Sequence, residues 1–386
     1  MTTKRCWPKH KLGEVADLCL GKMLDKNKNK GELHPYLGNI HVRWGMFDLE
    51  SLPQMRFEKH EHERYGLKRG DLVVCEGGEP GRCALWNDQV PNLKIQKALH
   101  RVRPHPCLDS HYLLYWFLWA GQRSYFDQFF TGATIKHLPG EKLAMVEIDL
   151  PDLPTQRKIA GILSAYDDLI ENNLRRIKIL EQMAQSLYRE WFVHFRFPGH
   201  ESARVIDSEL GQIPKGWEVR TIEELVKRIP VGKKYDQKTA NSTGTVPIFD
   251  QGKTGVIGYH DDQPGVEASE TDPVIVFANH TCYQRLIHYS FSAIQNVLPF
   301  LPSPLLLRNI YWLHYATNGR LVLNDYKGHW PEFAALLVIV PPAEICQRFG
   351  VFIEPLSLEM LKLQRAVDVL RRTRDLLLPK LLNNDE

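Results

Sequence analysis

The sequence predicts an α+β protein made of two similar halves, each an α/β domain followed by a long helix. Three observations indicate this fold: a repeat of about half the chain length, a heptad pattern in each copy, and short apolar runs bounded by turn residues. At 386 residues the chain also exceeds one comfortable hydrophobic core, so two domains are expected.

The repeat is clearest where each half ends. The first copy opens at Leu150-Pro151 and continues with Gln156-Arg157, and the second opens at Val340-Pro341 and continues with Gln347-Arg348. The two copies are separated by about 190 residues, which makes an internal duplication the basis of the domain organisation.

Apolar residues in both copies follow alternating spacings of four and three, the pattern of a heptad seam. Only Arg374 interrupts the second seam, while Asn173 places a polar group on the first, where it could fix the register. Pro379 should limit the second helix. A buried amphipathic helix remains the alternative to paired helices. The predicted pairing residues are Ile159, Leu163, Tyr166, Ile170, Ile177 and Leu180 in the first helix, and Leu356, Met360, Leu363, Val367 and Leu370 in the second.

These boundaries predict four segments: a domain at 1–150, a helix at 151–197, a domain at 198–340 and a helix at 341–386. Within the domains, the apolar runs 72–75 and 274–277 are typical of strands, and 112–118 and 309–313 of short buried helices.

Composition excludes some classes of protein and leaves others open. The net charge of +3 is too small to demonstrate nucleic-acid binding. No apolar run has membrane-spanning length and the first residues lack a signal-peptide core, so we expect a cytoplasmic protein without a membrane partner. Seven scattered cysteines without a Cys-x-x-Cys pair argue against a disulfide framework and a zinc ribbon.

Several short motifs, taken in order, carry a resemblance to a known family. Leu12-Gly13-Glu14-Val15, Gly70-Asp71-Leu72, Gly132-Ala133-Thr134, the run 150–159 and the run 246–252 together resemble the target recognition domains of type I restriction enzyme specificity subunits. The resemblance covers nearly the whole chain. The second half departs from it, because no Gly-Ala-Thr counterpart occurs near Asn318-Gly319-Arg320.

The resemblance implies two recognition domains at opposite ends of an antiparallel coiled coil of two long helices, with pseudo-twofold symmetry. Isologous pairing of two similar domain-helix units would produce the same arrangement. A helix of about 36 residues spans roughly 54 Å, so the two recognition domains should lie about one to one and a half duplex turns apart. A split DNA target with an unread gap is therefore expected.

Motifs for catalysis are missing from the sequence. No Asn/Asp-Pro-Pro-aromatic loop of an amino-adenine methyltransferase occurs, and no P-loop surrounds any Gly-Lys pair. The run His60-Glu61-His62-Glu63-Arg64 lacks a second ligand cluster at suitable spacing, which favours a solvated face over a metal site. We therefore expect no catalytic residue, metal or cofactor in this chain.

Sequence-specific reading of DNA needs long donors and acceptors on loops. Glycines at Gly77, Gly78 and Gly81 suit close approach to DNA and tight turns equally. Phosphate contacts are expected from Lys22, Lys26, Lys28, Lys30, Lys233, Lys234 and Lys238. The predicted base-reading residues, for which ordinary loop solvation is the alternative, are His41, Arg43, Arg82, Thr134 and Lys136 in the first domain and Asn279, His280, Gln284 and Arg285 in the second.

The resulting hypothesis is a DNA-reading scaffold without activity of its own. By resemblance, its partners are double-stranded DNA, two modification subunits that use S-adenosylmethionine to methylate adenine, and restriction subunits that use ATP and Mg²⁺. Two alternatives stay open: an enzyme with an unrecognised site, and a coiled-coil adaptor that binds only proteins.

Overall fold

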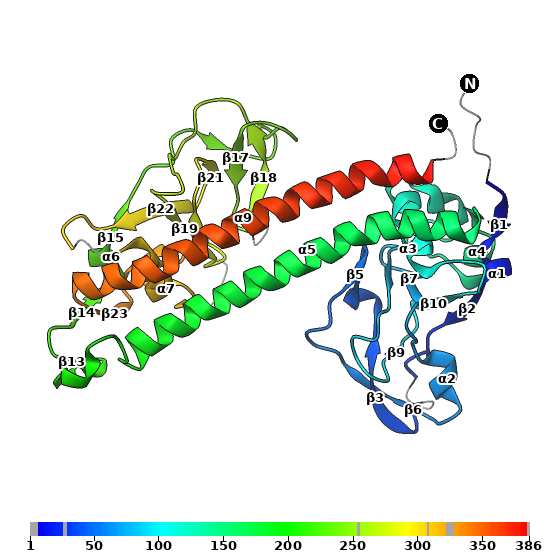
Figure 1. Ribbon diagram of the computed structural model, residues 1–386, viewed down its shortest axis with the longest axis horizontal. Helices are drawn as coiled ribbons and strands as arrows, with labels where there is room; N and C mark the ends of the chain where they lie inside the picture. The colour runs from blue at the N-terminus through cyan, green and yellow to red at the C-terminus, as the bar shows by residue number, and fades with distance from the viewer. Residues whose placement is uncertain (1–6, 26–28, 253–254, 307–308, 322–327, 384–386) are drawn as a thin grey trace. The chain divides into compact units, whose positions relative to one another are not determined.

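The computed structural model describes residues 7–25, 29–252, 255–306, 309–321 and 328–383 (Figure 1). The chain forms two compact units: the first comprises Met1–Glu171 with Val367–Glu386, and the second comprises Asn172–Ala366. Two long helices, α5 (Leu153–Tyr188) and α9 (Ala343–Leu382), each contribute one part to each unit. No helix among the described residues is long and apolar enough to cross a membrane.

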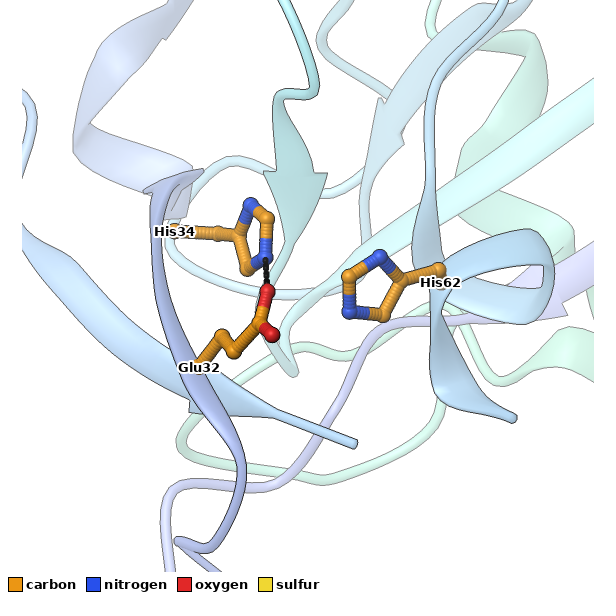
Figure 2. A group of neighbouring side chains, drawn as sticks. All are labelled: Glu32, His34 and His62. Atoms are coloured by element: carbon orange, nitrogen blue, oxygen red, sulfur yellow. Dashed lines mark ion pairs between the residues drawn. The ribbon is translucent and has the colours of Figure 1, made fainter. Parts of the chain in front are cut away.

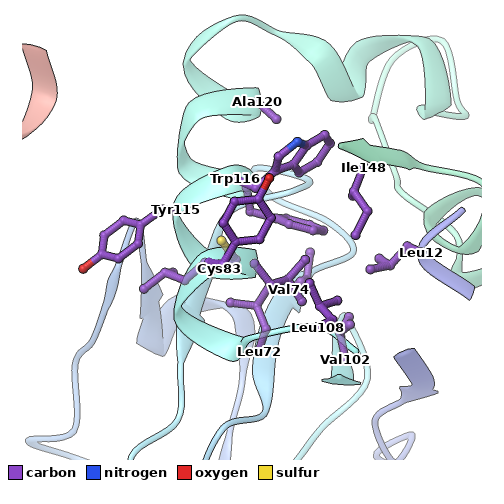
Figure 3. Close-up of a cluster of buried hydrophobic side chains, with 14 of the residues drawn as sticks. Leu12, Leu72, Val74, Cys83, Val102, Leu108, Tyr115, Trp116, Ala120 and Ile148 are labelled. Atoms are coloured by element: carbon purple, nitrogen blue, oxygen red, sulfur yellow. The ribbon is translucent and has the colours of Figure 1, made fainter. Parts of the chain in front are cut away.

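The first unit is built on an antiparallel sheet in the order β2-β10-β7-β8. Its strands are β2 (Ala16–Leu20), β10 (Leu99–Pro104), β7 (Leu72–Cys75) and β8 (Cys83–Leu85). Helix α3 (Ser110–Gln122) packs on this sheet, and the Asp109 carboxylate accepts hydrogen bonds from the first turn of that helix. Aromatic residues of α3 fill the core together with apolar side chains of the strands (Figure 3).

A smaller sheet of the first unit has the order β6-β3-β9. Strand β3 (Glu32–Leu37) pairs antiparallel with β6 (Gln54–Phe57) and parallel with β9 (Lys94–Ile95). The short helix α2 (Glu61–Tyr65) follows β6. A separate hydrophobic cluster that includes Leu37, Trp86 and Ile95 supports this part of the unit.

The remaining elements of the first unit are short. They are β1 (Lys9–Lys11), paired with β11 (Glu147–Asp149), then α1 (Leu12–Val15), η1 (Asn39–His41), β4 (Val42–Arg43), β5 (Met46–Phe47), η2 (Tyr125–Phe129) and α4 (Gly140–Ala144).

The second unit repeats this plan. Its antiparallel sheet β15-β22-β19-β20 contains β15 (Val226–Arg228), β22 (Val297–Pro302), β19 (Val274–Ala278) and β20 (Gln284–Ile287). Helix α7 (Ile310–Thr317) takes the place of α3, and Asn309 caps it as Asp109 caps α3. The predicted duplication and the strands and helices expected within it are therefore confirmed.

The second small sheet has the order β16-β21-β17-β18. Its strands are β16 (Lys234–Tyr235), β21 (Ser292–Ile294), β17 (Val246–Phe249) and β18 (Val256–His260). The other elements are η3 (Arg189–Val193), η4 (His200–Ser202), the pair β12 (Val205–Ser208) and β13 (Gly211–Pro214), the pair β14 (Glu218–Thr221) and β23 (Leu337–Val340), α6 (Ile222–Leu225) and α8 (Trp330–Ala334).

Within the first unit, the beginning of α5 meets the end of α9. Ile159 and Leu163 of α5 share one core with Leu378 and Leu382 of α9. An ion pair joins Asp167 to Arg374, and the Tyr115 hydroxyl donates a 2.6 Å hydrogen bond to the same carboxylate. Contacts between the start of one helix and the end of the other require antiparallel helices.

The second unit contains the complementary contacts. Arg176 of α5 pairs with Glu359 of α9 at 2.8 Å, and the rings of Tyr188 and Trp191 lie 6.2 and 5.9 Å from that of Phe349. The end of α5 thus meets the beginning of α9, and the predicted antiparallel pairing of the long helices is confirmed in each unit.

All of the expected pairing residues are at least partly covered. Exposed apolar residues occur on other faces of the same helices, for example Leu169 and Val369. The buried members of the set are Ile159, Leu163, Ile170, Leu363 and Val367, and the half-buried members are Tyr166, Ile177, Leu180, Leu356, Met360 and Leu370.

The observed helices differ from the segments expected at 151–197 and 341–386. Helix α5 changes to a π-helical turn at Arg189–Val193, and α9 continues through Pro379 to Leu382. Pro379 was expected to limit the helix, but its carbonyl accepts a hydrogen bond from the Asn383 amide. Burial of Leu378 and Leu382 in the first unit holds this last turn in place.

We predict that Val367→Asp destabilises the protein by at least about 3 kcal/mol, because Val367 is 0% exposed and a carboxylate there would be buried. The matched control is Val369→Asp, two residues along the same helix at a position 62% exposed, which should change stability by less than about 0.5 kcal/mol. Denaturant unfolding measures both. Equal effects of the two substitutions would contradict the assigned buried face.

Candidate nucleic-acid interface

Three loops of the first unit meet where β7 ends and β8 begins. We call residues 39–47, 76–82 and 131–137 the first loop cluster. The Arg82 guanidinium donates a 2.8 Å hydrogen bond to the Asn39 carbonyl, and the Trp44 indole donates one of 2.7 Å to Glu79. The Leu138 amide, directly after the third loop, donates to the Glu76 carbonyl at 2.8 Å. Segments far apart in sequence therefore form one surface.

The loop 131–137 is exposed at all seven positions. Two backbone hydrogen bonds of 2.8 and 2.9 Å between Thr131 and His137 close its base. Gly132 has φ +90°, and a Cβ there would lie 2.2 Å from the Ile135 carbonyl oxygen, so this position requires glycine. The result is a loop with a closed base, which presents Thr134, Ile135 and Lys136 to solvent.

The five residues predicted to read DNA in the first unit have different roles in the structure. Arg43, Thr134 and Lys136 are exposed, with Arg43 3.8 Å from Asp48 and Lys136 3.6 Å from Asp127. His41 is buried instead, and its Nδ1 accepts a hydrogen bond from the Gly38 amide at 3.0 Å.

Arg82 is also largely covered, because Glu79 and the Asn39 carbonyl bind its guanidinium. His41 and Arg82 therefore stabilise the loops, whereas Arg43, Thr134 and Lys136 form their surface.

The glycines of the loop 76–82 serve the turn. Gly78 and Gly81 have φ of +77° and +89°, which other residues adopt rarely. A Cβ on Gly81 would also lie 2.8 Å from the buried ring of Phe126. The sequence left two explanations open, close approach to DNA and tight turns. The positive φ values favour tight turns at these two positions, and the packing of Phe126 adds a second constraint at Gly81.

The second unit builds an equivalent surface, which we call the second loop cluster: residues 250–252, 279–283 and 328–330. The turn 279–283 joins β19 to β20 as 76–82 joins β7 to β8. The His329 amide donates to the Asn279 carbonyl at 2.9 Å, matching the bond from Leu138 to Glu76. The His280 amide donates to the Gln251 side chain at 2.8 Å.

The predicted residues of the second unit are placed as follows. Asn279 is half-buried, and its Oδ1 accepts a hydrogen bond from the Trp330 amide at 2.8 Å. His280 is half-buried on the same turn. The Arg285 guanidinium lies over the rings of Tyr283 and Phe249, 4.8 and 5.5 Å from their centroids.

Gln284 lies inside the second unit, away from the loop surface expected from the sequence. Its Nε2 donates to the His314 carbonyl at 3.0 Å and its Oε1 accepts from the Thr317 hydroxyl at 3.0 Å. Gln284 is the first residue of β20, and the alternation of that strand directs its side chain toward α7.

The lysines expected to contact phosphate also divide into two groups. Lys30, Lys234 and Lys238 are exposed, and so is Lys233, which pairs with Asp262 at 2.8 Å. Lys22 is 3% exposed, because its ammonium forms an ion pair with Glu61 and hydrogen-bonds the Arg56 carbonyl. Lys22 is therefore a structural residue. Lys26 and Lys28 lie outside the described residues.

Sequence reasoning missed apolar residues of the first loop cluster. Ile40, Met46 and Ile135 are 65%, 59% and 66% exposed. Apolar side chains can contact thymine methyl groups in the major groove. The sequence offered one signal for these apolar residues: they lie in turn-rich segments, near the polar residues predicted to read DNA.

Two groups of side chains in the described part of the chain could hold a metal ion. They are Glu32 with His34 and His62, shown in Figure 2, and Glu58 with His60 and Glu61. Both lie in the first unit, outside the loop cluster.

Comparison with known proteins finds relatives of one class. Residues 5–182 match the family described as Type I restriction modification DNA specificity domain. The chain is 27% identical over 345 residues to the Type I restriction enzyme MjaIX specificity subunit of Methanocaldococcus jannaschii, covering 81% of this chain and 77% of the relative. It is 30% identical over 255 residues to the Putative type I restriction enzyme MjaX specificity subunit of the same organism, covering 64% and 59%.

The fold comparison agrees with the sequence matches. The type I restriction-modification S subunit from M. genitalium aligns over 99% of this chain and 98% of its own, with a TM-score of 0.59 at 17% identity. In its first half the chain thus carries the match to a DNA specificity domain. Over most of its length it is similar to the specificity subunits of type I restriction enzymes.

The buried contact between Gln284 and His314 gives a prediction on pH. Burial, and secondarily the nearby His288, lowers the pKa of His314 from 6.5 to about 4. Folding therefore disfavours protonation of His314, so its contribution to stability is complete above pH 6.5 and is lost as the pH falls toward 4. The difference between these two pKa values corresponds to about 3 kcal/mol.

His314→Asn removes this titration while keeping a polar side chain. We expect the free energy of unfolding of the natural protein to fall more steeply between pH 6.5 and 4 than that of the variant, as measured by urea unfolding at each pH. Parallel pH profiles would show that His314 does not titrate in this way.

Proposed function

We propose that this chain reads DNA sequence for a type I restriction-modification complex and performs no chemical step itself. The observation that carries the proposal is the duplicated loop cluster, built on corresponding strand pairs in the two units. The similarity of the chain to specificity subunits supports the same function. A protein-binding adaptor would account for the paired helices but gives no reason for two similar loop surfaces.

Each loop cluster would read one block of a bipartite duplex target. The exposed Thr134 can hydrogen-bond to a base edge, and Ile135 beside it can contact a thymine methyl group. Arg43 and Lys136 would neutralise phosphates or read guanine. The hydrogen bonds at the bases of the loops would limit the conformational freedom lost on binding.

The catalytic partners would be two modification subunits and one or more restriction subunits acting in the cytoplasm. S-adenosylmethionine would bind the former, and ATP and Mg²⁺ the latter. Exposed apolar side chains on the long helices offer area for such docking, with Ile179 and Met183 on α5 and Val351 and Phe352 on α9 exposed by about half or more.

The central experiment is selection from random duplex DNA by the chain co-purified with its modification subunit. We expect enrichment of two short sequence blocks separated by a gap of fixed length and random composition. One continuous block would contradict two reading surfaces, and no enrichment would favour the adaptor.

Lys136 provides a test of the first loop cluster. If its ammonium contacts phosphate, Lys136→Gln should weaken binding about equally on all sequences and reduce the slope of log K against log salt by about 0.9. Lys9→Gln, which removes an exposed charge on β1 outside the cluster, is the matched control. Fluorescence anisotropy at several salt concentrations measures both slopes. Equal slopes for Lys136→Gln and the natural protein would remove Lys136 from the interface.

A further inference from the structure

Two imidazoles and a carboxylate converge between strand β3 and helix α2 in the first unit (Figure 2). Glu32 and His34 are two residues apart on β3 and so point to the same face of the strand, while His62 comes from α2. The rings of His34 and His62 have centroids 4.6 Å apart. One potential ligand atom from each of the three residues lies within 4.8 Å of the others.

The two imidazoles have unsatisfied nitrogen atoms at this point. The Nε2 atoms of His34 and His62 are both buried, and neither has a hydrogen-bond partner among the described residues. The nearest carboxylate oxygen, from Glu32, is 3.9 Å from His34 Nε2, which is too long for a hydrogen bond. Buried polar atoms nearly always have a partner, so a group that binds both nitrogens would satisfy a requirement that the protein atoms leave unmet.

We propose that Glu32, His34 and His62 form a binding site for Zn²⁺. Two imidazole nitrogens and a carboxylate oxygen are a ligand set that zinc uses in proteins, and the tetrahedral geometry would leave the fourth position to water. The side chain of Glu32 is 76% exposed, so it can move toward the imidazoles. The arrangement places the three ligands on two elements that are distant in sequence.

One neighbouring charge opposes the binding of zinc at this position. The Lys94 ammonium, which donates to the His62 carbonyl at 3.4 Å, repels a second cation. The carboxylate of Glu32 offsets this repulsion, because it is the anionic ligand of the group.

The second acidic group is a weaker candidate. The carboxylate of Glu61 is already occupied by the ammonium of Lys22, and hydrogen-bonds the Glu58 amide at 2.9 Å. His60 lies at the start of α2 and is exposed. His60 therefore serves as a matched control: it is a histidine two residues from His62 that the proposed site does not use.

Zinc at this position would connect α2 to β3. Strand β3 ends at Leu37, and the first loop cluster begins two residues later at Asn39. The corresponding small sheet of the second unit gains a fourth strand, β16, on β21. In the first unit the equivalent contact is the isolated bridge between Lys22 and Gln96. A metal link would therefore strengthen the less extensive of the two sheets.

The test uses the full chain after removal of metals with a chelator. Titration with Zn²⁺, followed by metal analysis of the desalted protein, should give saturable binding of one ion per chain. His34→Gln and His62→Gln should each weaken binding at least by the factor of about 10 to 100 that follows loss of an outer-shell partner. His60→Gln should bind as the natural chain does.

A second measurement needs no substitution, so it is unaffected by any folding defect of the variants. Zinc should slow hydrogen exchange in β3 and α2 of the natural chain, and Co²⁺ in its place should give the visible absorption of a tetrahedral complex. Failure of the natural chain to bind zinc, or equal binding by the His34 and His62 variants, would overturn the proposal. Neither result depends on DNA binding, so the proposed function is tested separately.

Discussion

The first unit depends on the pairing of two helices that are distant in sequence, and the ion pair between Asp167 of α5 and Arg374 of α9 illustrates this constraint. The core formed by residues before position 171 is completed by Leu378 and Leu382, which lie more than two hundred residues further along the chain. Arg374 interrupts an otherwise apolar heptad seam, and the ion pair with Asp167 explains the interruption. Burial, and then the carboxylate of Asp167, raises the pKa of Tyr115 well above its ordinary range, so its hydroxyl stays protonated and donates to this pair.

The core of the second unit is also completed by residues from the other half of the chain, but through aromatic contacts. Aromatic rings take the place of the ion pair there, because Tyr188 at the end of α5 and Trp191 and Phe192 in η3 pack around Phe349. In each unit a helix end from one half of the sequence covers a core formed mainly by the other half. Neither half of the chain therefore has all the side chains that its own core requires.

The duplication and the paired helices could be predicted because they depend on periodic patterns that extend over many residues. It was harder to predict which individual residues lie at the surface, because the direction of a side chain depends on where its strand begins. Gln284 was expected on a loop, but it starts β20 and turns inward to His314. His41 and Lys22 are polar residues of the kind usually found at the surface, yet both are buried. His41 accepts a hydrogen bond from the Gly38 amide, and Lys22 forms an ion pair with Glu61. Thr134 and Lys136 were expected on a loop and do lie on an exposed one.

The group around His34 could not be recognised from spacing, because its members are separated by nearly thirty residues and come together only through the fold. The matching registers of the two small sheets show which positions correspond in the two units. Tyr36 and Leu37 pair with β9 as Ile248 and Phe249 pair with β21, so His34 corresponds to Val246. In the second unit the ring of Tyr235 on β16 stacks on that of His260 on β18, with the ring centroids 4.2 Å apart. An added strand in the second unit and the proposed metal ligands in the first would therefore give the corresponding loop clusters equivalent support.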